Sequence, residues 1–301
     1  MERNSEQRGI VARVRNTLAE TSAVDLALRL TLLDLLLRPV GDWTLRPAIL
    51  AFAGGGLLFP RALRQPGLWW LLTLFTGLRV LFDYPLPDNH AYLLGYWCLA
   101  IALAVSDGDT DALLATNGRW LIGLVFGFAT LWKVALSPDY LDGTFFRISL
   151  LTDSRFEDLT RLIGRLPLTE IFANREILEG HLDGPPLPGT GLALPASFHL
   201  LAVAMTWWTV AIEGLLAMAF LWPRDRGPSR LRDAALLAFC ATTYAAATVE
   251  GFGWLLIAMG VAQCPPERPR TRGLYLAAFA LILFYREVPW TAPLLAWVAP
   301  G

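Results

Sequence analysis

Lys133 is the residue of this sequence best suited to take up a proton inside an apolar segment. The chain has 25 lysine and arginine residues, and every one except Lys133 is an arginine. The lysine lies in the stretch GFATLWKVALSPDYLDG, directly after an apolar run. A lysine amine can lose its proton when it is removed from water, whereas an arginine guanidinium stays charged. Lys133 is therefore a candidate general base.

A structural role for Lys133 is the alternative. Its stem could lie along an apolar helix while its ammonium reaches the membrane interface, as lysines near helix ends often do. Because this chain uses arginine at every other basic position, an arginine would serve that role equally well. The two interpretations predict different outcomes for Lys133→Arg.

Other ionisable side chains lie in or beside apolar segments, where their burial is costly and functional roles are common. His90 opens one such segment in LPDNHAYLLGYW, where it could instead belong to a helix start capped by Asp88 or Asn89. Glu213 lies deeper in WWTVAIEGLL, where it could contact a substrate or form a structural ion pair with an arginine. Further candidates are His199, Glu250, Asp25, Arg29, Asp34 and Arg79.

The composition indicates an integral membrane protein. Hydrophobic residues make up 55% of the chain and charged residues only 17%, and the mean hydropathy is +0.46. Soluble domains usually carry charges at about a quarter of their positions. Because the chain is so apolar, membrane lipids are its expected surroundings. The formal charge of −1 argues against a nucleic-acid partner. Cys98, Cys240 and Cys264 have no disulfide or zinc spacing, and no metal site is predicted.

These residues need helices to position them, and nine apolar segments are predicted to cross the membrane. A bilayer core needs about 20 helical residues. The expected fold is an all-α integral membrane protein, a bundle of about nine transmembrane helices that forms one membrane domain over residues 1–301. The segments are 22–39, 47–60, 67–83, 90–106, 119–136, 197–222, two within 233–264 that part near TVEGFG, and 273–288.

One long loop, 137–196, separates the fifth and sixth segments. Within it, DSRFEDLTRLIGRLPLTEIF has the spacing of amphipathic helices, and GHLDGPPLPGTGLALP is predicted to be an irregular connection. Arginine clusters fall in alternate loops, which by the positive-inside rule places the N-terminal segment 1–21 in the cytoplasm and the long loop outside. In that topology His90, Lys133, His199 and Glu250 lie near the same face and could surround one pocket.

Three stretches resemble one known family. DNHAYLLGYWCLAIALA and FATLWKVALSPDYLDG resemble, in order, two segments of the HTTM (horizontally transferred transmembrane) family, which is related to the membrane domain of vitamin K-dependent gamma-glutamyl carboxylase. WWTVAIEGLLAMAF is similar to a third segment of that family, with Glu213 at its acidic position. The similarity covers roughly residues 20 to 265. The chain departs from the carboxylase at Val134, in place of a second lysine, and at Tyr244, where a histidine is missing. The large extracytoplasmic C-terminal domain is also not expected.

The resemblance implies a quinol-dependent carboxylase, an enzyme of the lyase class. It assigns to Lys133 the removal of a proton from a reduced, vitamin K-like quinone, after which oxygen and carbon dioxide react. Lys133 and His90 are the expected catalytic residues, and a protein or peptide substrate is expected at the extracytoplasmic face. The residues expected to contact substrate or cofactor are Asn89, Tyr92, Trp132, His199 and Glu213.

Two other classes of function stay open. The chain could be a non-catalytic membrane subunit that assists maturation or export of a partner protein, with the loop 137–196 as the contact surface. A transporter is the third interpretation, although the sequence lacks paired broken helices in corresponding halves. In each case we expect a multi-pass protein, with a bacterial inner membrane as its location.

Overall fold

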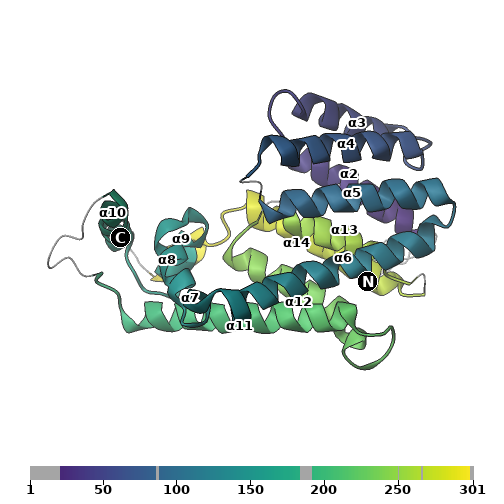
Figure 1. Cartoon of the computed structure of the whole chain (residues 1–301). Coiled ribbons are helices and arrows are strands. Elements are labelled where there is room, and N and C mark those ends of the chain that lie inside the picture. Colours follow the sequence, from purple (N-terminus) through teal and green to yellow (C-terminus); the bar gives the residue numbers. More distant parts are fainter. Residues whose placement is uncertain (1–20, 86–87, 184–191, 250, 266, 299–301) are drawn as a thin grey trace, which may run out of the picture. The chain divides into compact units, whose positions relative to one another are not determined.

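The protein is all-helical. The computed structural model describes residues 21–85, 88–183, 192–249, 251–265 and 267–298, and every regular element within these ranges is a helix. Figure 1 shows long helices together with a group of shorter ones. The predicted all-α class is therefore confirmed.

Each of the nine predicted apolar segments coincides with a helix. The fifth begins at Thr110 rather than at 119, because Asp111 in the first turn suits a helix N-terminus and Gly118 lets the helix approach the backbone of Met259 closely. The helices are α2 (Ala23–Leu37), α3 (Arg46–Leu58), α4 (Pro66–Phe82), α5 (Asn89–Asp107), α6 (Thr110–Leu131), α11 (Ala196–Leu221), α12 (Arg232–Ala246), α13 (Phe252–Ala262) and α14 (Pro269–Glu287).

Three helical segments of the described chain are long and apolar enough to cross a membrane. They are Asn89–Asp107, Thr110–Leu136 and Ala196–Leu221. Shorter apolar helices, such as Phe252–Ala262, fall below the roughly 20 residues that a bilayer core requires. The structure thus contains candidate membrane spans, and nine spans stay a prediction.

Contacts divide the chain into two compact units, which are described separately. The first consists of Met1–Val125, Leu216–Ala241 and Val249–Leu283, and the second of Phe126–Leu215, Thr242–Thr248 and Phe284–Gly301. Helices α6 and α11 each contribute residues to both units. The single membrane domain over 1–301 stays a prediction.

Three buried tryptophans form the centre of the first unit, where α2 packs against α3 and α13, and α4 packs against α5 (Figure 1). Trp69, Trp97 and Trp254 are almost completely buried, and each indole N–H donates a hydrogen bond. Their acceptors are the Leu63 carbonyl at 2.8 Å, the Thr31 hydroxyl at 2.9 Å and the Phe279 carbonyl at 3.1 Å. Pairing these groups avoids the cost of burying an unsatisfied polar atom.

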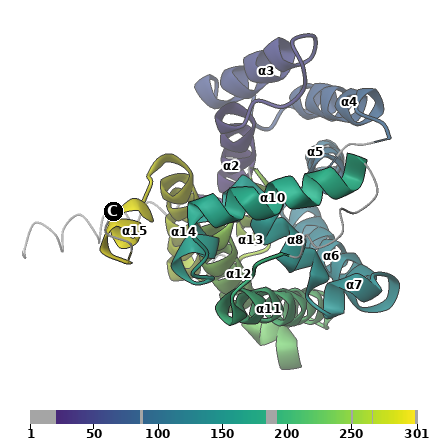
Figure 2. The same ribbon diagram turned by 90° about the vertical axis from the view of Figure 1, so that its left-hand side faces the viewer.

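Short helices build the second unit. They include α7 (Pro138–Leu141), α8 (Thr144–Thr152), α9 (Glu157–Leu162), α10 (Leu168–Asp183) and α15 (Ala292–Val298). Figure 2 shows α10 crossing α8, and both bury apolar side chains in one cluster that includes Phe146, Leu150 and Ile171. Helix α9 and the start of α10 lie within residues 153–172, and the amphipathic, interfacial character predicted for this stretch stays a prediction.

The irregular connection predicted for residues 180–195 is only partly correct. Residues 180–183 continue α10, because its helical hydrogen bonding extends beyond Gly180 to Asp183. Residues 192–195 contain no helix, and 184–191 lie outside the described residues.

Helix α13 approaches α14 closely because it has a glycine at the contact. A Cβ atom added to Gly260 would lie 2.8 Å from Cε1 of Tyr275 and 3.0 Å from Cδ2 of Leu236. Tyr275 cannot easily move aside, since it is fully buried and its hydroxyl donates a 2.8 Å hydrogen bond to Asp233. The contact therefore requires a residue without a side chain.

We expect Gly260→Ala to lower the free energy of unfolding by about 1–3 kcal/mol through overpacking. Gly55→Ala is the matched control, because an added Cβ there meets nothing within 4 Å and alanine favours a helix. Thermal unfolding of the two variants in detergent measures the difference. Equal stability of the two would contradict the close packing of α13.

Candidate functional site

Lys133 lies on a π-helix that extends α6. The five residues Trp132–Leu136 form this element, η1. Trp132, Val134 and Leu136 point outward, with 51% to 61% of each residue exposed. The lysine side chain is turned the other way and is only 17% exposed. Single π-helical turns within α-helices occur frequently at functional sites.

The lysine is paired with a carboxylate from α11. Its Nζ lies 2.5 Å from Oε2 of Glu213, whose side chain is 10% exposed. An ion pair was one of two interpretations of Glu213, but the arginine expected as its partner is wrong. Removing two charges from water is costly unless they compensate each other, so the one lysine and this glutamate stabilise each other's burial.

An aromatic ring lies beside the lysine, and a threonine is hydrogen-bonded to that aromatic residue. Nζ of Lys133 lies 5.4 Å from the centre of the Tyr140 ring, within the range of a cation–π contact. The Tyr140 hydroxyl is hydrogen-bonded to Thr209. Burial raises the pKa of the Tyr140 phenol, and the charge of Glu213 raises it further, so the phenol stays protonated. The Thr130 hydroxyl is buried and has no hydrogen-bond partner in the described part of the chain.

This arrangement leaves the lysine able to hold a ligand. An ammonium has three N–H donors, and the Glu213 contact is the hydrogen bond that Lys133 makes within the described residues. The remaining N–H groups could bind the oxygen of a ligand. The 2.5 Å separation of nitrogen and oxygen makes the contact with Glu213 a short, charge-assisted hydrogen bond.

His90 takes the position of a helix start, as its alternative interpretation predicted. Asp88 caps α5 by accepting a 2.8 Å hydrogen bond from the Ala91 amide, so the cap is Asp88 and not Asn89. Nδ1 of His90 lies 3.6 Å from Asp88, and its ring packs 4.4 Å from the ring of Phe252. These contacts hold the imidazole at the start of α5.

The structure brings together some of the predicted site residues. Lys133 and Glu213 are in contact, and Trp132 and His199 belong to the same unit as that pair but are largely exposed. Asn89, His90 and Tyr92 lie in the first unit, with Asn89 exposed and Tyr92 half-buried. One pocket formed by all of them stays a prediction. Glu250, also expected there, lies outside the described residues.

Sequence reasoning missed Tyr140, whose ring lies beside the lysine, and Thr209, which is hydrogen-bonded to Tyr140. It also missed the buried hydroxyl of Thr130. Tyr140 occurs in the stretch FATLWKVALSPDYLDG, so its proximity in sequence was a usable signal. Thr130 precedes Lys133 by about one helical turn, the spacing that places two residues on one face. Nothing in the sequence marks Thr209, because threonines are common in helices of this chain.

No protein-family model, curated protein or solved structure matches this chain. The resemblance to the HTTM family therefore rests on the three sequence stretches alone. Within the described residues, no group of three or more histidine, cysteine, aspartate or glutamate side chains is arranged to hold a metal ion.

Removing one member of the pair should destabilise the protein. We expect Lys133→Met to lower the free energy of unfolding by about 3–5 kcal/mol, because the Glu213 carboxylate would stay buried without its partner. The double variant Lys133→Met/Glu213→Leu should recover most of this loss. Denaturant unfolding in detergent measures both changes.

Arg155→Met is the control for this comparison. It breaks the more exposed ion pair with Asp153, where the arginine side chain is 46% exposed, and should cost about 1 kcal/mol or less. If the double variant were no more stable than Lys133→Met, the two side chains would not be coupled.

Proposed function

We propose that this chain is a gamma-carboxylase-like membrane enzyme in which Lys133 acts as general base on a reduced quinone. The observation that carries the proposal is the contact between Lys133 and Glu213, which gives a half-buried amine a group to exchange its proton with. The resemblance of the surrounding stretch to the HTTM family supports the same role.

The proton path involves two side chains. In the proposed step, transfer of a proton from Nζ of Lys133 to Oε2 of Glu213 leaves a neutral amine. The amine then accepts a proton from the substrate hydroxyl, so that the pair ends with an ammonium and a protonated acid. Glu213 thus has the role of making the amine available, which adds to its predicted binding role.

The residues present fit a phenolic ligand. Lys133 retains N–H groups for an oxygen, and the Thr130 hydroxyl is buried without a partner in the described chain. Trp132 precedes the lysine in sequence but points outward, so its predicted contact with the quinone rests on the resemblance alone. When bound, a reduced quinone would supply an acidic hydroxyl and the electrons that oxygen takes up. The predicted roles of Asn89 and His90 in orienting a quinone rest on the resemblance alone.

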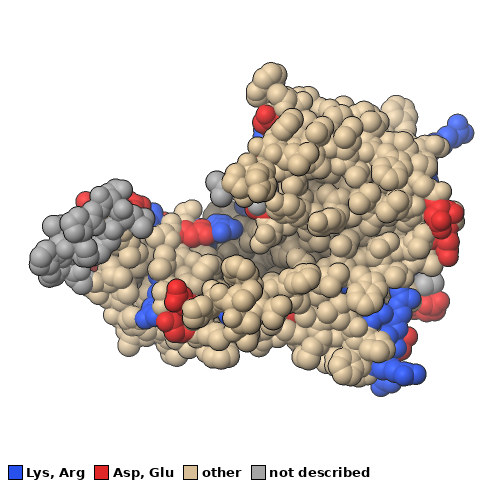
Figure 3. All heavy atoms as spheres, in the orientation of Figure 1, with Lys and Arg blue, Asp and Glu red and all other residues tan. Residues whose placement is uncertain are grey.

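The proposed enzyme lies in a bacterial inner membrane with nine spans, its N-terminal segment 1–21 in the cytoplasm and the loop 137–196 outside. Charge distribution supports a membrane location. In Figure 3 basic atoms gather at the end of the first unit where α11 leads into α12, a connection that carries Arg224, Arg226 and Arg230. The face over α4 and α5 is mostly uncharged in this view, as contact with lipid requires.

Replacing the amine by a group that cannot lose its proton tests the proposal. We expect Lys133→Arg to keep the charge next to Glu213 but to lower the rate by about 10² to 10⁴-fold, the usual contribution of a general base. The measurement is oxidation of a reduced naphthoquinone under air by the purified protein.

Arg155→Lys is the control, since it exchanges the same two residue types at a surface ion pair of the same unit. Its rate should equal that of the unchanged protein. A Lys133→Arg variant that folds and oxidises the quinol at the full rate would exclude the general-base role and leave the interfacial interpretation of the lysine.

One observation favours the alternative of a non-catalytic subunit. Phe145 and Ile148 on α8 and Phe172 on α10 are each nearly half exposed. Apolar side chains that gather on a surface often mark the contact with a protein or a membrane. In this second candidate function, the helical segment after Lys133 binds the partner protein.

The two functions respond oppositely to one pair of variants. If the chain is a partner-binding subunit, Phe145→Ser/Phe172→Ser should abolish its cellular function while Lys133→Ala leaves that function intact. If it is an enzyme, Lys133→Ala should abolish function. Complementation of a strain that lacks the gene measures both, with protein level in the membrane as the control.

A further inference from the structure

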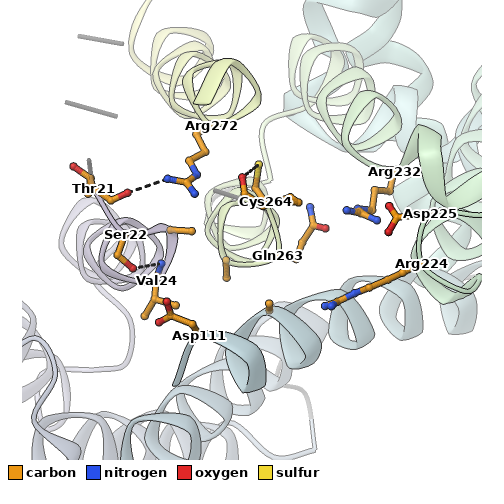
Figure 4. Close-up of a pocket in the computed structure, with 14 residues that line it drawn as sticks. Thr21, Ser22, Val24, Asp111, Arg224, Asp225, Arg232, Gln263, Cys264 and Arg272 are labelled. Carbon is orange, nitrogen blue, oxygen red and sulfur yellow. Dashed lines mark hydrogen bonds between the residues drawn. The ribbon is translucent and has the colours of Figure 1, made fainter. Parts of the chain in front are cut away.

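A second candidate site lies within the first unit and contains none of the predicted catalytic or binding residues. A cavity of about 460 Å³ opens between the start of α2, the start of α6, the connection from α11 to α12 and the ends of α13 and α14 that face each other (Figure 4). Its volume lies in the range of small-molecule sites. Three arginines line it, Arg224, Arg232 and Arg272, together with two aspartates, Asp111 and Asp225.

Among the residues that the structure describes, no carboxylate forms an ion pair with the buried Arg232. Only 4% of the residue is exposed, and its Nη1 donates a 3.2 Å hydrogen bond to the neutral hydroxyl of Ser229. Its Nε is buried without any hydrogen-bond partner in the described chain. A buried guanidinium normally has a counter-charge, because leaving it without one costs several kcal/mol. An anion in the cavity would provide that charge.

The nearby aspartates do not provide it. Asp233 accepts hydrogen bonds from Gln263 at 2.7 Å and from Tyr275 at 2.8 Å, and its other oxygen lies 3.4 Å from Arg268. Asp111 and Asp225 line the cavity, yet neither comes within 4.0 Å of a guanidinium nitrogen of Arg224 or Arg232. The positive charge of the lining exceeds its negative charge by one.

Arg224 adds a second donor that can move. It is exposed, and Figure 4 shows its side chain reaching along α6 toward the cavity. Arg272 approaches from the opposite side, where its Nη1 donates a 2.9 Å hydrogen bond to the carbonyl of Thr21. Planar guanidinium groups that converge from different directions suit the oxygens of a phosphate group.

We propose that this cavity binds a phosphate ester, with Arg232 as the fixed donor and Arg224 closing over the ligand. The lining carries one net positive charge, which matches the single negative charge of a phosphodiester. Two sources carry this chemistry, the headgroup of a membrane phospholipid and a soluble phosphate compound. The site is independent of the proposed reaction at Lys133.

Titration of the purified chain in neutral detergent tests the site. The probes are phosphatidylglycerol in mixed micelles, oleate in the same micelles as an anion without phosphate, and inorganic phosphate against chloride at equal ionic strength. Because a ligand of the folded state raises the unfolding temperature, binding is followed by thermal unfolding. We expect a rise with phosphatidylglycerol or phosphate, and none with oleate or chloride.

The variants locate the binding. Arg232→Gln and Arg224→Gln should each weaken binding about tenfold or more, the effect of losing one charge-assisted hydrogen bond. Arg226→Gln is the matched control, because it removes the same charge from the same connection but does not line the cavity. If Arg232→Gln does not fold, Arg224→Gln decides, since that side chain is exposed.

Each outcome has a defined meaning. A response to phosphatidylglycerol alone assigns the site to a lipid headgroup, and a response to inorganic phosphate assigns it to a soluble compound. No response to either probe, or an equal loss in Arg226→Gln and Arg232→Gln, would overturn the proposal. Equal loss would mean that diffuse positive charge, and not the cavity, attracts the anion.

Discussion

The burial of one lysine is the constraint on which the second unit depends. An amine inside an apolar environment needs a counter-charge, and Glu213 provides it from a helix 80 residues further along the chain. The contact joins η1, the π-helix that follows α6, to α11. The Tyr140 ring lies beside the lysine, and the Tyr140 hydroxyl is hydrogen-bonded to Thr209. The ion pair is thus linked to side chains of α7 and α11.

Much of the helical arrangement could be predicted, because apolar runs of sufficient length have few other structures available. Each of the nine segments coincides with a helix to within a few residues except at the start of α6, where the prediction missed the nine residues 110–118 because the first turn is polar. The helices in 153–172 followed from their 3.6-residue spacing. The continuation of α10 through residues 180–183 did not, because Gly180 and the prolines that follow are typical of a loop.

The site was less predictable, for reasons of geometry. Lys133 stood out by its residue type, and Glu213 by its depth in an apolar segment, but nothing in the sequence links two positions so far apart. The π-helix depends on backbone hydrogen bonds that cannot be predicted from a residue pattern.

The phosphate cavity was missed for a different reason. Its arginines belong to clusters that the positive-inside rule already explained, and only burial separates Arg232 from its exposed neighbours.

The π-helix has a consequence for the evolution of this segment. A π-helical turn holds one more residue than an α-helical turn, so it can be regarded as an insertion that the helix absorbed without losing its hydrogen bonding. Each α-helical residue advances by 100°, so loss of Trp132, the residue of η1 that precedes Lys133, would turn the lysine by about that angle relative to α6. The outward Val134 and Leu136 follow the lysine, whereas the number of residues before Lys133 sets the direction of the lysine.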